Sequence, residues 1–325
     1  MKLISNLLLL STFVAATLGF CASASAQRYP THPVRLVVPY SPGTATDVLA
    51  RTVAEKLGEA WGQAVVVDNQ PGANGTIATA TVAKAAPDGY TLIMIAANHV
   101  INASLYKNLP YDDVKDFRAL ARIGQAAFVL CVNPALPVKT LGDLVALAKQ
   151  QPGKLNYASP GNGTPGHLAM EMIKTLSGAD IAHVPYRGAA QANTDLVGGQ
   201  VQLGFVVESS AIPMIKAGKL RAIAMSSAAR SRQLPDVPTV AESGYPGFDV
   251  VSWIGLAGPA QLPADLVAMI SADTAKVLNT AEVQGRITGL GLTAFPAAAD
   301  EFGGYLVTEH AKWAKAVKDS GATID

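Results

Sequence analysis

The chain has 325 residues, of which 50% are hydrophobic, with 25 Lys and Arg against 24 Asp and Glu. The near-neutral charge, without any basic run, disfavours nucleic acid and anionic membranes as partners. A chain of this length buries a large core, and two lobes are favoured over one.

Residues 1–26 have the pattern of an export signal. Lys2 is the only charge among them, Leu3–Phe20 is largely apolar, and Ala24–Ala26 fits a small-x-small cleavage site. We therefore expect a signal peptide over 1–26 and a periplasmic mature protein. An uncleaved membrane anchor is less favoured, because the apolar run is short and ends in small residues. No direct membrane insertion is expected after cleavage.

Removing 26 residues from 325 leaves 299, which contain one cysteine, Cys131. An intramolecular disulfide is therefore excluded in the mature chain. Cys131 lies in the apolar, strand-like run Phe128–Val132. This setting predicts a buried small hydrophobic side chain rather than a nucleophile.

The first predicted elements are a strand, a loop and a helix. Val34–Val38 is a short β-branched run typical of a buried strand, and Pro39–Ala45 is a loop of turn formers. Thr46 or Asp47 is expected to cap the helix that follows. A helix that begins at such a loop presents free backbone N–H groups, which suit an anionic group on a small ligand.

The alternation of strands and helices continues along the chain. Further strands are expected at Ala64–Asp68, Tyr90–Ala96, Phe128–Val132, Leu155–Ala158, Ala182–Pro185, Val201–Val207, Leu220–Ser226 and Val250–Leu256. Helices are expected at Gly75–Ala85, Thr140–Lys149, His167–Leu176, Ala189–Gly198, Ser210–Ala217, Ala264–Leu278 and Asp300–Ser320. This order predicts an α/β fold with mostly parallel sheets and helices on both faces. Ligands then lie beyond the carboxyl ends of the strands.

A second loop of the same type is Ser159–His167, in which Pro165 suits the first helical turn. Gly161–Gly166 matches the dinucleotide pattern G-x-G-x-x-G, which by itself is a weak signal. A dinucleotide site also needs an acidic residue at the end of the next strand, but Ala182–Pro185 is followed by Tyr186 and Arg187. A carboxylate ligand fits this loop better than a nucleotide.

Eight segments occur in an order that resembles one known family. They are HPVRLVVPYSPGTATDVLAR, VVVDNQPGANGTIA, APDGYTL, LYKNLPYDDVKDF, YASPGNGTPGHLA, VPYRGAAQANTDLVGGQV, IKAGKLRAIA and LPDVPTVAESGYPGFDVVSWIGL. Together they resemble the substrate-binding proteins of tripartite tricarboxylate transporters, the TctC or Bug family. The resemblance covers the whole mature chain.

The resemblance implies a periplasmic, two-lobed binding protein of type II, the Venus flytrap fold. It implies lobe 1 at 27–126 and 250–325, lobe 2 at 127–249, and a return segment through the hinge in which Trp253 packs. It also implies a small mono- or dicarboxylate ligand between the lobes, and a permease with one large and one small membrane subunit as partner. The expected function is capture and delivery of that ligand, without catalysis.

Two positions depart from the family's pattern. The first loop usually reads Pro-Gly-Gly, but here it is Pro42-Gly43-Thr44, and threonine excludes some glycine-only conformations. The strand that ends near Val207 often carries Phe-Asp-Asn, but here the residues are Phe205, Val206 and Val207. The second change predicts a less polar ligand than is usual in the family.

The expected ligand-binding residues come from the strand-end loops. They are Tyr40, Gly43, Thr44, Ala45, Asp47, Asn98, His99, Ser159, Gly161, Asn162, Gly163, Thr164, His167, Tyr186, Arg187, Val206 and Val207. Ser159 and Thr164 are the leading side chains, Asn98 and His99 are expected in a contact loop, and Asp47 and His167 also admit purely structural roles.

Two alternatives remain open at this point. A binding protein that signals to a membrane sensor kinase needs the same closure and is not separable by sequence. An exported hydrolase is less favoured, because the chain has no G-x-S-x-G elbow and no acid is assigned to orient a Ser159–His167 pair. No cofactor is expected, and His32, His183 and His310 lack metal-ligand spacing.

Overall fold

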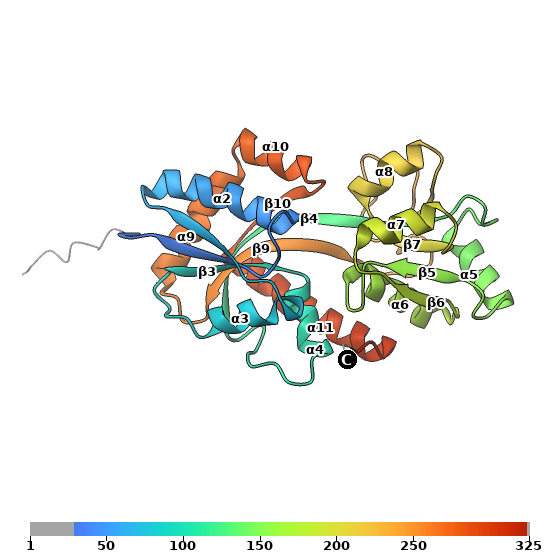
Figure 1. Ribbon diagram of the computed structural model, residues 1–325, viewed down its shortest axis with the longest axis horizontal. Coiled ribbons are helices and arrows are strands. Elements are labelled where there is room, and N and C mark those ends of the chain that lie inside the picture. Colours follow the sequence, from blue (N-terminus) through green and yellow to red (C-terminus); the bar gives the residue numbers. More distant parts are fainter. Residues whose placement is uncertain (1–28, 324–325) are drawn as a thin grey trace, which may run out of the picture.

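Two strands, β4 (Phe117–Val132) and β9 (Val251–Pro259), cross the middle of the molecule and join its two lobes (Figure 1). The computed structural model describes residues 29–323, so the expected signal peptide at 1–26 lies outside the described residues. Residues of β4 up to Ala127 pair with β9, and from Phe128 onward they pair with lobe 2 strands. This change of partners lies next to the lobe boundary expected from the sequence.

Lobe 1 carries most of the elements at both ends of the chain. Its strands besides β4 and β9 are β1 (Val34–Val38), β2 (Val65–Asn69), β3 (Thr91–Ala96) and β10 (Thr293–Ala298). Its helices are α2 (Ala45–Trp61), the 3-10 turn η1 (Ala73–Gly75), α3 (Thr76–Ala83), α4 (Asn98–Leu105), α9 (Ala264–Leu278), α10 (Ala281–Gly289) and α11 (Ala299–Ser320).

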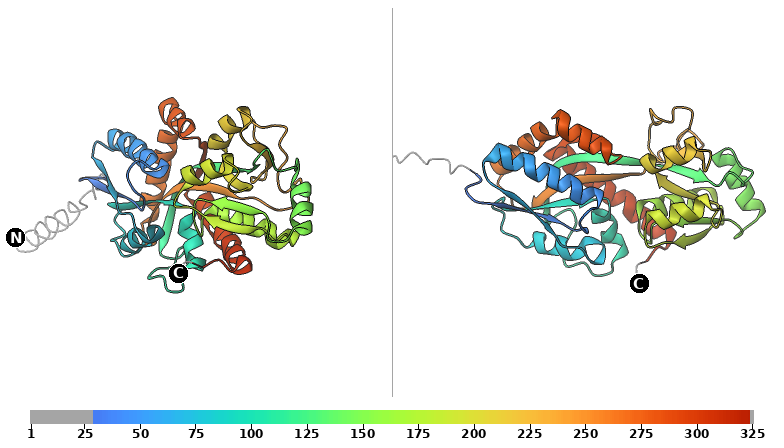
Figure 2. Two further views of the ribbon diagram at one scale, coloured as in Figure 1. Left: turned by 45° about the vertical axis from the view of Figure 1, so that its right-hand side comes forward. Right: turned by 45° about the horizontal axis from the view of Figure 1, so that its top comes forward.

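Lobe 2 is formed by the middle of the chain (Figure 2). Its strands besides the second half of β4 are β5 (Asn156–Ser159), β6 (Ala182–Pro185), β7 (Leu203–Val207) and β8 (Arg221–Met225). Its helices are α5 (Leu141–Gln150), α6 (Pro165–Ser177), α7 (Ala189–Val197) and α8 (Glu208–Lys216).

The sheet runs in the order β2-β1-β3-β9-β4-β7-β5-β6, with β10 and β8 also paired to β4. The two-lobed α/β class is confirmed, but the sheet is mixed rather than mostly parallel. Within the lobes, β1 pairs parallel with β2 and β3, and β5 with β6 and β7. The pairs that involve β4 and β9 are antiparallel, because the chain crosses between the lobes once in each direction.

Helices cover both faces of each sheet, as the alternation predicted. In lobe 1, α2 and α9 pack on one face through residues such as Leu49 and Ile270, and α3, α4 and α11 pack on the other. The hydrophobic core beneath α3, α4 and α11 continues into lobe 2, where α5 and α6 cover it. Cys131 is fully buried on the opposite face of that lobe, which confirms its expected role as a small hydrophobic side chain.

The C-terminal helix α11 is fixed to the crossover strands by a buried carboxylate. The indole nitrogens of Trp253 and Trp313 donate to Glu309 Oε2 at 3.0 and 2.9 Å, and all three side chains are buried. Trp253 therefore packs at the hinge, as expected. Between residues 29 and 323, none of the helices combines the length and apolar character that crossing a bilayer requires.

Several elements of lobe 1 were not expected from the sequence, among them helix α4. No strand was expected between Ala96 and Phe128, but β4 already begins at Phe117, and its first half pairs with both β9 and β10. Helix α10 and strand β10 were also missed. Both are weakly patterned, and β10 contains Pro296, so its pairing with β4 is visible only in three dimensions.

Candidate functional site

The first expected binding loop joins β1 to α2, and the first turn of α2 points from lobe 1 toward the lobe 2 loops (Figures 1 and 2). Thr44 is the N-cap, and its Oγ1 accepts a hydrogen bond from Asp47 N at 3.3 Å. The predicted cap at Thr46 or Asp47 was therefore wrong, since the helix begins earlier, at Ala45. Gly43 has φ +86°, which explains a glycine before the cap.

Asp47 is buried and closes this loop from beneath. Its Oδ2 accepts from Gly43 N at 2.9 Å and from Arg51 Nε at 3.2 Å, and its Oδ1 accepts from Asn69 Nδ2 at 2.8 Å. Burial raises the pKa of Asp47, but the hydrogen bonds from Gly43, Asn69 and Arg51 outweigh burial and hold the pKa below its ordinary value. With both oxygens occupied, Asp47 acts as a structural anchor of the loop.

Arg51 and Asn69 complete this anchor and were missed by the sequence reasoning. Arg51 Nη2 donates to Asn69 Oδ1 at 2.8 Å, and Asn69 Nδ2 also donates to the carbonyl of Tyr40 at 3.1 Å. A signal existed for Asn69, because it is the last residue of β2, at the sheet edge where β1 also ends. The N–H groups of Ala45 and Thr46 in the first turn of α2 have no hydrogen-bond partner among the described residues.

The sequence had suggested that Asn98 and His99 lie in a contact loop, but the structure places them in a helix. Both belong to the first turn of α4, which starts directly after β3. His99 is 5% exposed, its Nε2 lies 2.7 Å from the carbonyl oxygen of Asp113, and its ring meets Phe117 edge-on. Burial lowers the pKa of His99, so this side chain packs in the core as a neutral group. Asn98 is half-buried beside the loop that follows β1.

The second expected loop, Ser159–Thr164, joins β5 to α6, and Pro165 occupies the first helical position as expected. Gly161 and Gly163 have φ values of +144° and +72°, which favour glycine. Thr164 Oγ1 donates to the carbonyl of Gly161 at 2.8 Å but makes no side-chain cap bond to α6. The N–H groups of Asn162, which is exposed, and of Gly166 and His167 in the first turn remain without a backbone partner in the described chain.

Two stacked histidines support this loop from inside lobe 2. His183 Nε2 lies 2.6 Å from Ser159 Oγ, and His167 Nδ1 accepts from Gly163 N at 3.1 Å. The two rings stack with centroids 4.1 Å apart, and Tyr157 stacks on His183 at 4.7 Å. Ser159 is 1% exposed. Its hydroxyl therefore points into the protein rather than toward the interlobe space.

The environment of both histidines favours their neutral form. Burial, with the neighbouring His167 and Lys174, lowers the pKa of His183 to about 3. Burial also lowers the pKa of His167. Sequence reasoning set His183 aside as scattered, because its contact with Ser159 depends on the register that places it opposite Tyr157 on β5.

Two more expected residues follow β6. Tyr186 N donates to the carbonyl of Ser159 at 3.0 Å, which ties the two lobe 2 loops together, and its hydroxyl donates to Asp195 Oδ2 at 2.8 Å. Arg187 is exposed next to Gly188, the residue before α7. Arg187 thus stands at the rim of the same strand-end surface.

The end of β7 forms an apolar wall beside these loops. Val206 is buried and Val207 is half-buried, and both line a small hollow of about 20 Å³ together with Pro160 of the second loop and Ala189 of α7. Glu208 begins the next helix, and its carboxylate accepts a hydrogen bond from Ser231 Oγ. Two apolar side chains therefore lie at this strand end, and their contact with a ligand stays a prediction.

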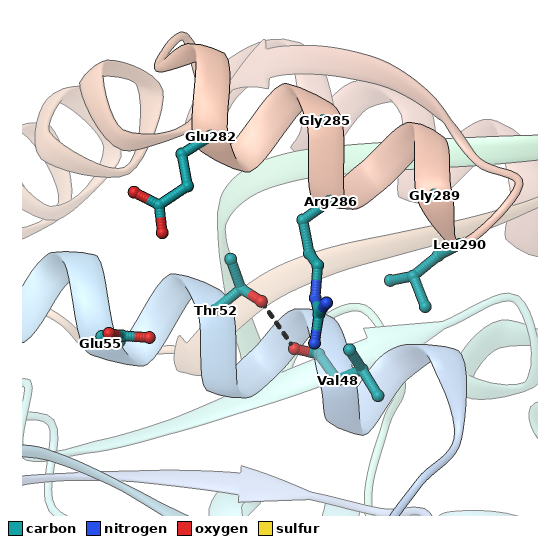
Figure 3. Close-up of a pocket in the computed structure, with 8 residues that line it drawn as sticks. All are labelled: Val48, Thr52, Glu55, Glu282, Gly285, Arg286, Gly289 and Leu290. Carbon is teal, nitrogen blue, oxygen red and sulfur yellow. Dashed lines mark hydrogen bonds between the residues drawn. The ribbon is translucent and has the colours of Figure 1, made fainter.

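A larger groove of about 620 Å³ lies between α2 and α10 (Figure 3). Its lining comes from lobe 1 alone, with Glu55 on α2 and Glu282 and Arg286 on α10 facing each other (Figure 3). Glu282 is already paired with Lys56 at 2.9 Å. Two carboxylates against one arginine do not suit an anionic ligand, so the groove is a poor alternative to the strand-end loops.

The structure thus brings the expected residues together as two sets. Tyr40–Asp47 and Asn98 lie at the strand ends of lobe 1, and Ser159–His167, Tyr186, Arg187, Val206 and Val207 lie at the strand ends of lobe 2. His99 falls outside both sets. Two α/β lobes whose strand ends face each other across two crossover strands define the class of periplasmic binding proteins.

Comparison with known proteins identifies the family within this class. The profile of the tripartite tricarboxylate transporter family receptor, TctC, matches residues 49–322, and the chain belongs to this family. Protein BugT of Bordetella pertussis is 34% identical over 311 residues, which cover 95% of each chain. The resemblance inferred from the ordered segments is confirmed.

Two solved relatives carry carboxylates. The R. palustris protein Rpa4515, solved with adipate, has a TM-score of 0.76 and 34% identity and covers 91% of this chain and 100% of its own. MatC from Rhodopseudomonas palustris, solved with bound malate, has a TM-score of 0.73 and 31% identity and covers 89% of this chain and 100% of its own. This chain therefore has a solute-binding fold whose relatives bind small carboxylates.

Proposed function

We propose that this protein captures a small carboxylate between its two lobes in the periplasm and delivers it to a tripartite tricarboxylate-type permease. The observation that carries the proposal is the pair of facing strand–loop–helix units. One offers the N–H groups of Ala45 and Thr46, and the other those of Asn162 and the first turn of α6. The adipate and malate complexes of the two relatives support the ligand class.

The energetics require both lobes. A helix N-terminus stabilises an anion by about 0.3–1 kcal/mol, or up to ~2 kcal/mol when buried. Removing a carboxylate from water costs several kcal/mol. One helix end is therefore insufficient, and direct or water-mediated hydrogen bonds from both loops are needed, which only closure about β4 and β9 supplies.

Two features favour binding over turnover. Ser159 and His183 form a close pair, but Ser159 is buried and the pKa of His183, lowered by burial to about 3, makes it a poor general base near neutral pH. The Ser159–His167 pair considered from sequence is not formed, since His167 Nδ1 bonds to Gly163. Sensing through a membrane kinase uses the same closure and remains the alternative role.

Ligand capture is tested by melting and solution scattering with adipate and malate as probes. Binding to the folded state stabilises it by about 2.7 kcal/mol at a hundredfold excess over Kd. For a chain of this size each kcal/mol raises the melting point by roughly 2–4 °C. The bound acid should also reduce the radius of gyration and be recovered unchanged. A melting shift without compaction contradicts interlobe closure, and consumption of the acid indicates an enzyme.

Transport and sensing are separated by the partner. Co-purification of the ligand-loaded protein with the two membrane subunits of a tripartite permease supports delivery. Stimulation of a sensor kinase, with no effect on carboxylate uptake when the protein is deleted, supports the alternative.

The apolar wall gives a prediction about ligand choice. Because Val206 and Val207 replace polar residues at the end of β7, the less polar adipate should bind more tightly than malate. Val207→Asn, at the half-buried position, should shift this preference toward malate by about tenfold, since one hydrogen bond to a charged group contributes roughly 1.5–3 kcal/mol. An unchanged rank order in calorimetry excludes Val207 from the ligand wall.

A further inference from the structure

A cavity of about 710 Å³ lies at the hinge, where β4 passes from lobe 1 to lobe 2. We call it the hinge cavity. Arg122, Phe295 and Tyr305 line it from lobe 1, and Ser231 and Arg232 line it from lobe 2. It contains none of the strand-end residues assigned to the interlobe ligand, so it is a separate space.

Arg122 is the unusual residue of this cavity. It is 5% exposed, and its guanidinium lies between the rings of Phe295 and Tyr305, 4.4 and 3.9 Å from their centroids. Burial lowers the pKa of Arg122, yet an arginine remains protonated at neutral pH. The cavity therefore contains a fixed positive charge in a largely dehydrated setting.

The hydrogen-bonding capacity of Arg122 is mostly unused. Its Nη2 donates to Gln125 Oε1 at 2.5 Å, whereas its Nε has no partner among the described residues. Its Nη1 likewise makes no hydrogen bond within residues 29–323, and it is not among the polar atoms sealed from solvent. An unpaired donor on a buried charged group is costly, so Nη1, the unpartnered nitrogen that is not sealed from solvent, is suited to an acceptor that the protein itself does not supply.

The two carboxylates that line the hinge cavity have other partners. Glu208 accepts from Ser231 Oγ, and Asp249 Oδ1 accepts from Ala228 N at 3.0 Å. Arg230, which also lines the cavity, is paired with Glu242 at 2.8 Å. Within the described chain no carboxylate forms an ion pair with Arg122, and the exposed Arg232 adds a second unpaired positive charge to the lining.

We propose that the hinge cavity is a second binding site, specific for a small organic carboxylate. The Nη1 amino group of Arg122 donates a charge-assisted hydrogen bond to the carboxylate of the ligand. The carbon part of the ligand packs against Phe295, which is 39% exposed, and the apolar side chains of Val251 and Ala127. This assignment does not depend on the function proposed for the strand-end loops.

Occupancy of this site is coupled to the position of the lobes, because the lining comes from both of them. A ligand that contacts both sides favours one interlobe arrangement over the others, and the coupling acts equally on the ligand between the strand ends. The ligand of the hinge cavity can be the transported acid itself or a different carboxylate. The experiment below separates these two sources.

The first test uses 4-bromobenzoate, whose bromine is located by anomalous scattering in crystals of the mature protein. The proposal predicts a bromine position in the hinge cavity with the carboxylate against Arg122. In Arg122→Gln this peak should disappear, and in Arg118→Gln it should persist. Arg118 is the matched control, since it lies on the same strand but forms an exposed ion pair with Asp300 at 2.9 Å. Bromine found between the strand ends alone, or a peak retained in Arg122→Gln, overturns the proposal.

The second test is a titration of the wild-type protein, so it does not depend on whether a core variant folds. In solution, the Nε–H resonance of Arg122 should shift saturably with benzoate or adipate, with a Kd of about 1 mM or tighter. The corresponding resonance of Arg118 should not move. A shift with adipate alone identifies an aliphatic dicarboxylate as the ligand, and a shift with benzoate alone identifies an aromatic carboxylate. No shift with either acid up to roughly 10 mM rules out the site.

Discussion

The two strand-end loops have the same plan but different anchors. Both follow a buried strand, both use a positive-φ glycine, and both end in a threonine at the N-cap position of a helix. The lobe 1 loop closes on the charged carboxylate of Asp47, whereas the lobe 2 loop rests on the neutral rings of His167 and His183. One architecture is thus stabilised by an ionic network on one side and by aromatic stacking on the other.

The two threonines show how this difference affects the ligand. Each hydroxyl donates to a carbonyl three residues earlier, at 3.0 Å for Thr44 and 2.8 Å for Thr164. Thr44 also accepts from the N–H of Asp47, but Thr164 makes no such bond to α6. The lobe 2 helix therefore keeps more of its first-turn N–H groups free. We expect lobe 2 to contribute more of the hydrogen bonding to the anion.

The largest effect is expected from removing the ionic anchor. Asp47→Ala leaves Gly43 N, Asn69 Nδ2 and the Arg51 side chain without their acceptor. The free energy of unfolding should fall by about 2–4 kcal/mol, because unsatisfied groups remain in a buried position. Urea unfolding measures this, and Asp47→Asn, which keeps one acceptor oxygen, should lose about half as much. Equal stability of Asp47→Ala and wild type would show that the network does not hold the loop.

The second prediction separates the anchors by pH. His183 has its pKa lowered to about 3 in the folded protein, by burial first and then by His167 and Lys174. The unfolded chain therefore takes up this proton first, near pH 6.5, and its contribution to stability is complete above pH 6.5 and is lost as the pH falls toward 3. The lowered pKa of Asp47 acts only at more acidic pH, below about 4.

Between pH 6.5 and 4.5, the free energy of unfolding of His183→Gln should therefore fall by about 1–2 kcal/mol less than that of wild type, allowing for partial exposure of the ring. His167 and His99 keep their own contributions in both proteins, so the comparison isolates His183. If the free energy of unfolding falls equally with pH in His183→Gln and wild type, the neutral form of His183 does not stabilise the fold.

These contrasts also show what the sequence could predict. Strand–loop–helix order, the glycines and the proline of α6 have local signals, and the expected elements of both lobes are found near their predicted positions. The partner of Ser159 has no local signal, because His183 is reached only through the parallel register of β5 and β6. The first half of β4 was likewise hidden, since Arg118, Arg122 and Gln125 mask a strand that is defined by pairing on both edges.

The sequence predicted which segments lie at the strand ends, but it did not predict which N–H groups in those segments stay free. Several N–H groups expected to hold the ligand are used inside the loops, as Gly43 N is by Asp47 and Gly163 N by His167. Such internal bonds depend on side chains four residues away, whose direction a sequence pattern does not fix. The roles of the individual site residues therefore stay predictions.

A third prediction concerns the lobe 2 threonine. Thr164→Val removes the hydroxyl that holds Gly161 and lies beside the free N–H groups of α6. The affinity for the bound carboxylate should fall roughly two- to tenfold, because the loop that presents these N–H groups loses a hydrogen bond that fixes it, and such a bond contributes about 0.5–1.5 kcal/mol. Calorimetry on the folded variant measures the loss, and Thr194→Val, an exposed helix position, is the control. Unchanged affinity with normal folding would exclude Thr164 from the site.

The smallest effect is expected at the matching position of lobe 1. The family resemblance implies a glycine where this chain has Thr44, but Thr44 adopts φ −69° and ψ 158°, an extended conformation open to any residue. The threonine therefore carries no backbone strain here and serves as the cap of α2.

Thr44→Gly should lower the free energy of unfolding by only a few tenths of a kcal/mol, because glycine is itself an accepted N-cap residue. Carboxylate affinity should change less than about twofold. Paired measurement of unfolding and binding for Thr44→Gly and Thr164→Gly then tests the asymmetry directly. A loss of affinity at Thr44 as large as at Thr164 would mean that both lobes hold the anion through their threonines, and the contrast between the two loops would be limited to their anchors.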